Sequence, residues 1–308
     1  MLYLEGKISS MIINVIDNDE IRIDKYLIDK IDISRSKIQK LIDEGKILVN
    51  DNVVKSSYIV KLDDVIFVDE NYEEKIEILP QDIKINIVYE DDDIAVINKE
   101  SGMVVHPAPG NYSNTLVNAL MYHFNNLSSV NGNIRPGIVH RIDALTSGLL
   151  VIAKNDKAHL FLANLLQTHD IKRTYIALVE GVIEEDTATI DAPIGRDKNN
   201  RKKMCVTSDN SKDAITHLRV LKRFKDSTLV ECNLETGRTH QIRVHLNYIN
   251  HPIVNDPVYG KKVIDADFGQ MLHAKKIEFM HPTKNELMIF SCETPKRFNE
   301  ILQEYENH

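Results

Sequence analysis

The sequence predicts an α+β protein with two domains: a large one built on a mixed, largely antiparallel sheet with flanking helices, and a small helix-helix-strand domain before it. Three observations support this prediction. The chain has 308 residues, 43% of them hydrophobic and 27% charged, which is enough to bury a sizeable core. Strand-type and helix-type hydrophobic patterns are interspersed along the chain. An acidic stretch with a proline, residues 70–86, separates a short patterned region from a long one.

The small domain is expected at residues 21–69, after an N-terminal extension at residues 1–20. Arg22–Glu44 reads as two short helices because its apolar residues recur at helical spacing. Gly45 is expected to end the second helix. Lys46–Val68 alternates β-branched segments with turn residues and is expected to form strands.

The large domain is expected at residues 87–308, after a linker at residues 70–86. Its strand patterns are Ile94–Asn98, Leu149–Ala153, Thr174–Val179 and Thr228–Leu234. Its helical patterns are Thr115–Phe124, Lys157–Thr168 and Thr239–Leu246.

The charge distribution is compatible with a polyanionic partner although the net charge is −8. Acidic residues are concentrated in Glu70–Glu100, whereas Ile171–His245 carries more basic than acidic residues. A basic surface can therefore form on the large domain. This pattern permits RNA binding without indicating it.

Two classes of protein are disfavoured by the remaining composition. The chain has no run of about 18 apolar residues and no signal peptide at its start, so we expect a cytoplasmic protein without a membrane partner. Its three cysteines, Cys205, Cys232 and Cys292, are far apart, which disfavours a zinc site or a disulfide framework.

The first candidate for chemistry is Asp143, within His140–Gly148 and just before an apolar strand. If residues 140–143 are extended, Arg141 and Asp143 share a face, and the Thr-Ser-Gly turn leaves the carboxylate at a strand end. The alternative is that Asp143 caps its own turn, as aspartates before such turns usually do.

The second candidate is the polar run Glu235–His245, which carries two arginines and two histidines. His240 and His245 are five residues apart, which disfavours a zinc pair on one helical face. Arg243 could bind a carboxylate bidentately and keep it ionised. The alternative is that the arginines are solvated or bind phosphate.

The third candidate is the basic segment Arg196–Lys203, which has a turn-like composition. It is expected either to contact phosphate or to form a solvated loop. Glycine-rich phosphate-binding motifs are absent from the sequence, so no nucleotide cofactor is expected.

These residues resemble a known family. His140–Gly148 is similar to the His-Arg-Leu-Asp-x-x-Thr-Ser-Gly signature of the RluA family of pseudouridine synthases. Asn98–Gly110 with Thr115–Leu120, Ala192–Met204 and Gly237–His245 agree with that family in order and spacing. Arg22–Leu27, Ser34–Ser36, Gln39, Gly45, Val49 and Asn50 resemble an S4 RNA-binding domain. This domain order is similar to the RluD-like branch, and the resemblance covers nearly the whole chain.

The resemblance implies specific roles. Asp143 matches the catalytic aspartate, Arg243 its ion-pair partner, and Tyr175 the active-site tyrosine that packs against the target base and could remove its C5 proton. Arg141 matches the arginine that holds the flipped nucleotide. The other expected RNA-binding residues are His140, Arg196, Arg201, Lys202, Lys203, Arg238 and His240 in the large domain and Arg35, Lys37 and Lys40 in the small one.

The implied function is an isomerase that converts specific uridines of large-subunit ribosomal RNA to pseudouridine, without a cofactor or metal. Three alternatives stay open at this point: the same chemistry on transfer RNA, a non-catalytic RNA-binding or ribosome-assembly protein, and a hydrolytic N-glycosidase. A monomer is the default expectation for the assembly.

Overall fold

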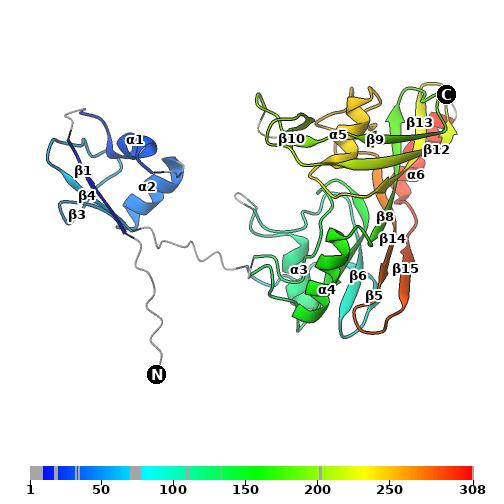
Figure 1. The fold of residues 1–308 in the computed structure, drawn as a ribbon, viewed down its shortest axis with the longest axis horizontal. Coiled ribbons are helices and arrows are strands. Elements are labelled where there is room, and N and C mark those ends of the chain that lie inside the picture. Colours follow the sequence, from blue (N-terminus) through cyan, green and yellow to red (C-terminus); the bar gives the residue numbers. More distant parts are fainter. Residues whose placement is uncertain are drawn as a thin grey trace. The chain divides into compact units, whose positions relative to one another are not determined.

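The computed structural model describes residues 10–16, 20–31, 33, 35–69, 78–108, 111–132, 134–200 and 203–306. The chain divides into two compact units, Met1–Ile76 and Glu77–His308 (Figure 1). The α+β class expected from the sequence is confirmed, and in the described part of the chain no helix is long and apolar enough to cross a membrane.

The first unit packs two helical segments against a four-stranded antiparallel sheet of order β1-β4-β2-β3. Its elements are β1 (Ser10–Asn14), α1 (Ile23–Tyr26), the 3₁₀ helix η1 (Leu27–Asp29), α2 (Arg35–Asp43), β2 (Ile47–Val49), β3 (Asn52–Val53) and β4 (Val65–Asp69). Strand β1, which pairs with β4 along its whole length, has no counterpart in the sequence prediction.

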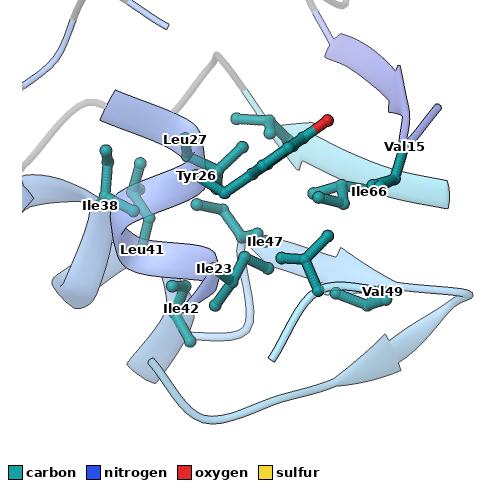
Figure 2. Packing of buried hydrophobic residues seen from close by; sticks show 12 residues of the cluster. Val15, Ile23, Tyr26, Leu27, Ile38, Leu41, Ile42, Ile47, Val49 and Ile66 are labelled. Atoms are coloured by element: carbon teal, nitrogen blue, oxygen red, sulfur yellow. The ribbon is translucent and has the colours of Figure 1, made fainter. Parts of the chain in front are cut away.

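The core of this unit is formed by the residues whose helical spacing is visible in the sequence. Ile23, Leu27, Ile38 and Ile42 are fully buried and belong to one cluster with Ile66 of β4 (Figure 2). Gly45 adopts a φ of 68°, a left-handed conformation that ends α2 as expected. Burial of these aliphatic side chains is the main stabilising term for so small a unit.

The second unit is built on a nine-stranded sheet of order β5-β6-β7-β14-β8-β13-β12-β9, with β15 paired to β14. The β7–β14 pair is parallel and the other pairs are antiparallel, so the predicted mixed, largely antiparallel sheet is confirmed. A separate hairpin of β10 and β11 carries the basic segment.

The bounds of these elements are as follows. The strands are β5 (Asn86–Glu90), β6 (Ile94–Lys99), β7 (Ser147–Ala153), β8 (Lys172–Glu180), β9 (Thr187–Asp191), β10 (Ile194–Arg196), β11 (Met204–Val206), β12 (Ile215–Arg223), β13 (Ser227–Leu234), β14 (Leu272–Met280) and β15 (Leu287–Ser291). The helices are α3 (Leu116–His123), α4 (Asp156–Gln167), α5 (Gln241–Tyr248) and α6 (Lys296–Glu306).

Helix α4 covers one face of the sheet where β6, β7 and β14 lie side by side (Figure 1). Its Leu162 packs with Val96, Val151 and Phe279 in a shared core. Asn155 caps α4 by accepting a hydrogen bond from the Ala158 N–H at 2.9 Å. The strand and helix patterns expected in this domain therefore correspond to real elements, each displaced by at most a few residues.

The segment after residue 77, which the sequence assigns to a linker, is hydrogen-bonded to α3. The side chain of Asn118 donates to the Leu79 carbonyl at 2.8 Å, and the Gln81 N–H donates to the Asn118 carbonyl at 2.9 Å. A cut that preserves these contacts has to lie before residue 78.

Candidate active site

Asp143 lies in the turn that leads into β7, and its side chain is 17% exposed. The Thr146 N–H donates to the main-chain carbonyl of Asp143 at 3.0 Å. The turn is therefore closed by the main chain, and the carboxylate is free to bind another residue. This geometry removes the main reason for reading Asp143 as a residue that caps its own turn.

The turn is held against the sheet by two strand neighbours. Gly148 has a φ of 112°, and a Cβ atom there would lie 2.3 Å from the Ala274 carbonyl oxygen of β14, so only glycine fits. Ala274 pairs with Gly148 on one side and with Tyr175 of β8 on the other. Three adjacent strands thus bring the Asp143 turn and Tyr175 to the same part of the sheet.

Arg243, in the first turn of α5, contacts two carboxylates. Its Nη1 donates to Oδ2 of Asp143 at 2.9 Å, and its Nε and Nη2 donate to the two oxygens of Asp256 at 2.7 and 2.8 Å. The sequence predicts a bidentate contact with the catalytic candidate, and this detail is wrong. The bidentate contact is made with Asp256, whose side chain is fully buried, and Arg243 donates one hydrogen bond to Asp143.

The charges of this triad support one another. Burial would raise the pKa of Asp256, but the Arg243 guanidinium and the N–H groups of Val258 and Tyr259 lower it below its usual range. Burial would likewise lower the pKa of Arg243, and the two carboxylates raise it instead. Arg243 is therefore a permanent buried cation whose orientation is set by Asp256.

A narrow cavity of about 80 Å³ opens beside this triad. Asp143, Tyr175 and Arg243 all line it, together with Leu272 of β14 and Arg141. Tyr175 is 6% exposed, and burial raises the pKa of its hydroxyl. A polar rim and an aromatic and aliphatic wall suit a planar polar base.

Lys99, at the end of β6, stabilises the Asp143 turn through a hydrogen bond to its main chain. Its side chain is 2% exposed, and its Nζ donates to the carbonyl oxygens of Glu100 and Ala144 at 2.7 and 2.8 Å. Ala144 directly follows Asp143. Burial lowers the pKa of Lys99 to about 7, although the nearby Asp143 carboxylate favours the charged form.

His240 lines the cavity on the α5 side, and Tyr259 contacts both His240 and Arg243. His240 has a φ of 57° at the start of α5, its Nδ1 is 3.0 Å from the Tyr259 hydroxyl, and its Nε2 is 4.0 Å from Asp143. The Tyr259 ring lies 5.1 Å from the Arg243 guanidinium. These contacts restrict the orientation of Arg243.

The predicted RNA-binding residues around the cavity are differently placed. Arg141 and Arg238 line it, and Nε of Arg238 donates to the Asp213 carbonyl at 2.8 Å. His140 accepts a hydrogen bond from the Val151 N–H at 3.0 Å, and burial lowers its pKa to about 3. His140 is therefore neutral at pH 7 and holds the segment before Asp143 on β7; its contact with RNA stays a prediction.

The predicted basic segment forms the β10–β11 hairpin. Arg196 is exposed at the end of β10, where the connecting loop begins, and Nζ of Lys203 lies 5.7 Å from the Tyr259 ring centre. Arg201 and Lys202 lie outside the described residues. Through Lys203 the hairpin contacts Tyr259, the residue that packs on Arg243.

The predicted RNA-binding residues of the small domain lie on α2 with exposed side chains. The guanidinium of Arg35 binds buried Asp24 at 2.8 Å, together with Arg22 and Gln39. Burial alone would raise the pKa of Asp24, but these hydrogen bonds lower it to about 2. Lys37 and Lys40 are exposed on the same helix. Their contacts with RNA stay predictions.

Sequence reasoning missed Asp256, Lys99 and Tyr259. Asp256 is followed by Pro257, which indicates a turn but not a partner 13 residues earlier in α5. Lys99 ends an apolar strand, and a lysine at that position usually reaches solvent. No spacing rule identifies either contact, because both depend on the tertiary structure.

One cluster of possible metal ligands occurs among the described residues, formed by Asp91, Asp93 and His281. Nε2 of His281 and Nζ of Lys284 both lie within 2.8 Å of the same Asp91 oxygen. The lysine cation therefore already neutralises this carboxylate, and the cluster is explained as a hydrogen-bonded structural feature.

The fold and the site together define a class of RNA-modifying enzyme. The chain matches the RNA pseudouridylate synthase family over residues 93–248 and the S4 domain over residues 21–66. It belongs to the RNA pseudouridylate synthase family, and it is therefore an isomerase that forms pseudouridine in RNA.

Relatives extend this similarity to nearly the full length. The chain is 49% identical to the uncharacterized RNA pseudouridine synthase YlyB of Bacillus subtilis over 92% of this chain and 93% of the relative. It is 45% identical to the ribosomal large subunit pseudouridine synthase D of Zymomonas mobilis over 86% of this chain and 87% of the relative. Human RNA pseudouridylate synthase domain containing 1 has a similar structure, with a TM-score of 0.56 and 28% identity over 73% of this chain and 86% of that chain.

The buried Lys99 generates a prediction for stability. Its pKa is about 7 in the folded protein and about 10.5 when exposed, so between these values the unfolded state binds more protons. The free energy of unfolding should therefore rise with pH in this window, by up to about 1.4 kcal/mol per pH unit. Below pH 7 both states are protonated and this dependence disappears.

Urea unfolding of wild type and Lys99→Met between pH 6 and 10 measures this effect. A plot of the free energy of unfolding against pH should be less steep for Lys99→Met than for wild type, by that slope. The same plot for Lys198→Met, a change at an exposed lysine, should follow wild type. Parallel curves for wild type and Lys99→Met would contradict the prediction.

Proposed function

We propose that this enzyme isomerises one or more uridines of large-subunit ribosomal RNA and that Asp143 is its catalytic carboxylate. The observation that carries the proposal is the Asp143 carboxylate, which is 2.9 Å from the buried Arg243 cation and lines the same cavity as Tyr175. The choice of RNA rests on relatives named ribosomal large subunit pseudouridine synthase D. The cytoplasmic location expected from the sequence is part of the same proposal.

The reaction detaches uracil from C1′ of the ribose, rotates it and rejoins it through C5. It involves no net oxidation or hydrolysis. The base cannot be reached inside a stem, so it has to be flipped into the cavity, at a cost of a few kcal/mol that is smaller in a loop. We therefore expect a stem-loop substrate.

Within the cavity, ionised Asp143 either attacks as a nucleophile or removes a proton from the sugar to promote cleavage of the glycosidic bond. In both routes the carboxylate needs a fixed orientation, and the hydrogen bond from Nη1 of Arg243 is placed to supply it. After the new C1′–C5 bond forms, C5 loses its proton and N1 gains one, so that net one proton moves from C5 to N1. Tyr175 packs against the base, and its hydroxyl can relay this proton by accepting it from C5 while releasing its own.

The S4 unit supplies a second site of attachment to the RNA. Exposed basic residues on α2, including Lys37 and Lys40, can contact phosphates. Two modest RNA contacts on one chain raise the overall affinity because the second contact becomes intramolecular.

The role of Asp143 predicts that Asp143→Asn abolishes turnover and leaves RNA binding within a few-fold of wild type. Site-resolved mapping of pseudouridine in cells lacking this protein, complemented with either version, measures the effect. Wild type should restore one or a few large-subunit sites, and Asp143→Asn should restore none. Asp186→Asn, at an exposed ion pair with Arg223, is the matched control.

Other results would contradict parts of this proposal. Restoration by Asp143→Asn would end the assignment of Asp143. Loss of transfer RNA sites instead of ribosomal ones would replace the proposed substrate. Release of free uracil by purified enzyme would indicate hydrolysis, and an unchanged map would favour a non-catalytic RNA-binding role.

The shared guanidinium predicts that Arg243→Lys lowers kcat on the order of 100-fold. A single ammonium cannot donate to both Asp256 oxygens and to Asp143 in the observed geometry. Single-turnover kinetics with purified enzyme measures this loss, and a melting curve checks that the variant still folds. Near-normal kcat in a folded Arg243→Lys enzyme would refute the positioning role; Arg219→Lys is the matched surface control.

Deletion of residues 1–76 is predicted to raise KM for a long ribosomal RNA fragment by about 10- to 100-fold and to leave kcat within a few-fold. The cut keeps the contacts of Leu79 and Gln81 with Asn118. Steady-state kinetics at several RNA concentrations separates the two parameters. An unchanged KM would show that the S4 unit does not capture this RNA.

A further inference from the structure

A second buried arginine, Arg173, lies beside the active-site cavity. It precedes Tyr175 by two residues on β8, so both side chains are on the same face of the strand. Arg173 is 8% exposed, and burial lowers the pKa of its guanidinium. The proposed chemistry assigns it no part.

Arg173 differs from Arg243 in its partners. Within the described residues it forms no ion pair, and its hydrogen bonds go to the carbonyl oxygens of Glu235 and Thr236 at 3.5 and 3.3 Å. Its Nε is buried and has no acceptor in that same part of the chain. Two long contacts with neutral acceptors are poor compensation for a buried cation.

Arg173 lines two hollows. One is the active-site cavity, and the other is a larger hollow of about 510 Å³ that also includes Arg141, Arg238 and His169. Among its lining residues the larger hollow has three arginines and no carboxylate. The two hollows share Arg141, Arg173, Gly237 and Arg238, so one nucleotide can extend from the first into the second.

Gly237 keeps the guanidinium accessible from this side. A Cβ atom at Gly237 would lie 2.6 Å from Nη1 of Arg173. A larger residue would therefore push against the group that faces the hollow. The absence of a side chain preserves room for a ligand.

We propose that the larger hollow binds a backbone phosphate of the RNA next to the flipped uridine, with Arg173 as its buried ligand. The planar guanidinium matches phosphate oxygens bidentately, and a phosphate would provide the negative partner that Arg173 lacks. Phosphate contacts fix the register of a strand, so this contact would set which nucleotide enters the cavity. The inference rests on the proposed function, which places the base in the neighbouring cavity.

The alternative is that Arg173 only stabilises the loop at Glu235 and Thr236 through its hydrogen bonds to their carbonyl oxygens. The two possibilities differ in what Arg173→Met would do. If Arg173 binds phosphate, the substitution changes the RNA affinity and its salt dependence. If Arg173 only stabilises the loop, the substitution lowers the melting temperature.

The test measures binding of the pentanucleotide AAUAA to the full chain carrying Asp143→Asn, at several salt concentrations. Adding Arg173→Met should weaken binding about 10-fold or more and reduce the slope of log affinity against log salt by about 0.7. Arg219→Met, which removes the same charge from an exposed pair with Glu231, should change neither quantity. Binding by the S4 unit adds the same term in every variant, so it is fitted as a second site and subtracted before the affinities are compared.

A second probe locates the phosphate. Each of the two phosphates that flank the uridine is replaced in turn by an uncharged methylphosphonate. At one of the two positions this replacement should weaken binding to the protein that retains Arg173. At the same position it should have little further effect on binding to the Arg173→Met protein. Unchanged affinity and slope in Arg173→Met would overturn the proposal, as would additive losses at both positions. If Arg173→Met does not fold, Arg173→Lys replaces it and should keep the slope but lose affinity; wild-type affinity in that variant would overturn the proposal.

These results are separable from those that test the proposed function. Failure of wild type to form pseudouridine would remove the isomerisation of ribosomal RNA and leave the phosphate effects standing. Normal turnover by an Arg173→Met enzyme with unchanged salt dependence would remove only the phosphate site.

Discussion

The site depends on one buried cation, the guanidinium of Arg243, which is held between two carboxylates. Asp256 takes both Nε and Nη2 and is itself fully buried, so it fixes the plane of the guanidinium. The remaining nitrogen, Nη1, is then directed at Asp143. Removing one partner of such a buried pair costs about 3–5 kcal/mol, because the other charge is left uncompensated. Asp256 is therefore needed for both the stability and the geometry of the site.

The rest of the second unit brings the two ends of this interaction together. Asp143 enters from the turn before β7, and Arg243 enters from α5, 100 residues later in the chain. The close approach of Gly148 to β14 and the two hydrogen bonds of Lys99 hold the Asp143 turn in place. Both constraints act on the main chain, so the carboxylate itself keeps its full capacity to bind Arg243 and substrate.

The two buried arginines illustrate how the partners of a charge indicate its role. Arg243 is fully compensated by carboxylates and orients a neighbouring group. Arg173 has no carboxylate partner in the described chain, and its hydrogen bonds go to main-chain carbonyl oxygens. An RNA phosphate could compensate its positive charge. The same chemical group thus serves a permanent structural pair in one place and an incoming ligand in the other.

The sequence by itself determined the local elements and the family. Helical spacing around Ile38 and strand patterns such as Leu149–Ala153 depend on short-range periodicity, which is readable along the chain. The motif around Asp143 identified the class of enzyme because it is a contiguous string.

Only the tertiary structure decided which groups meet. The sequence suggested a two-pronged contact between Arg243 and Asp143, and the fold directs that contact to Asp256 instead. It also buries Lys99 and leaves Arg173 without a carboxylate partner among the described residues. These outcomes depend on distances between segments far apart in the chain, and residue spacing carries no information about such distances until the strands and α5 have packed.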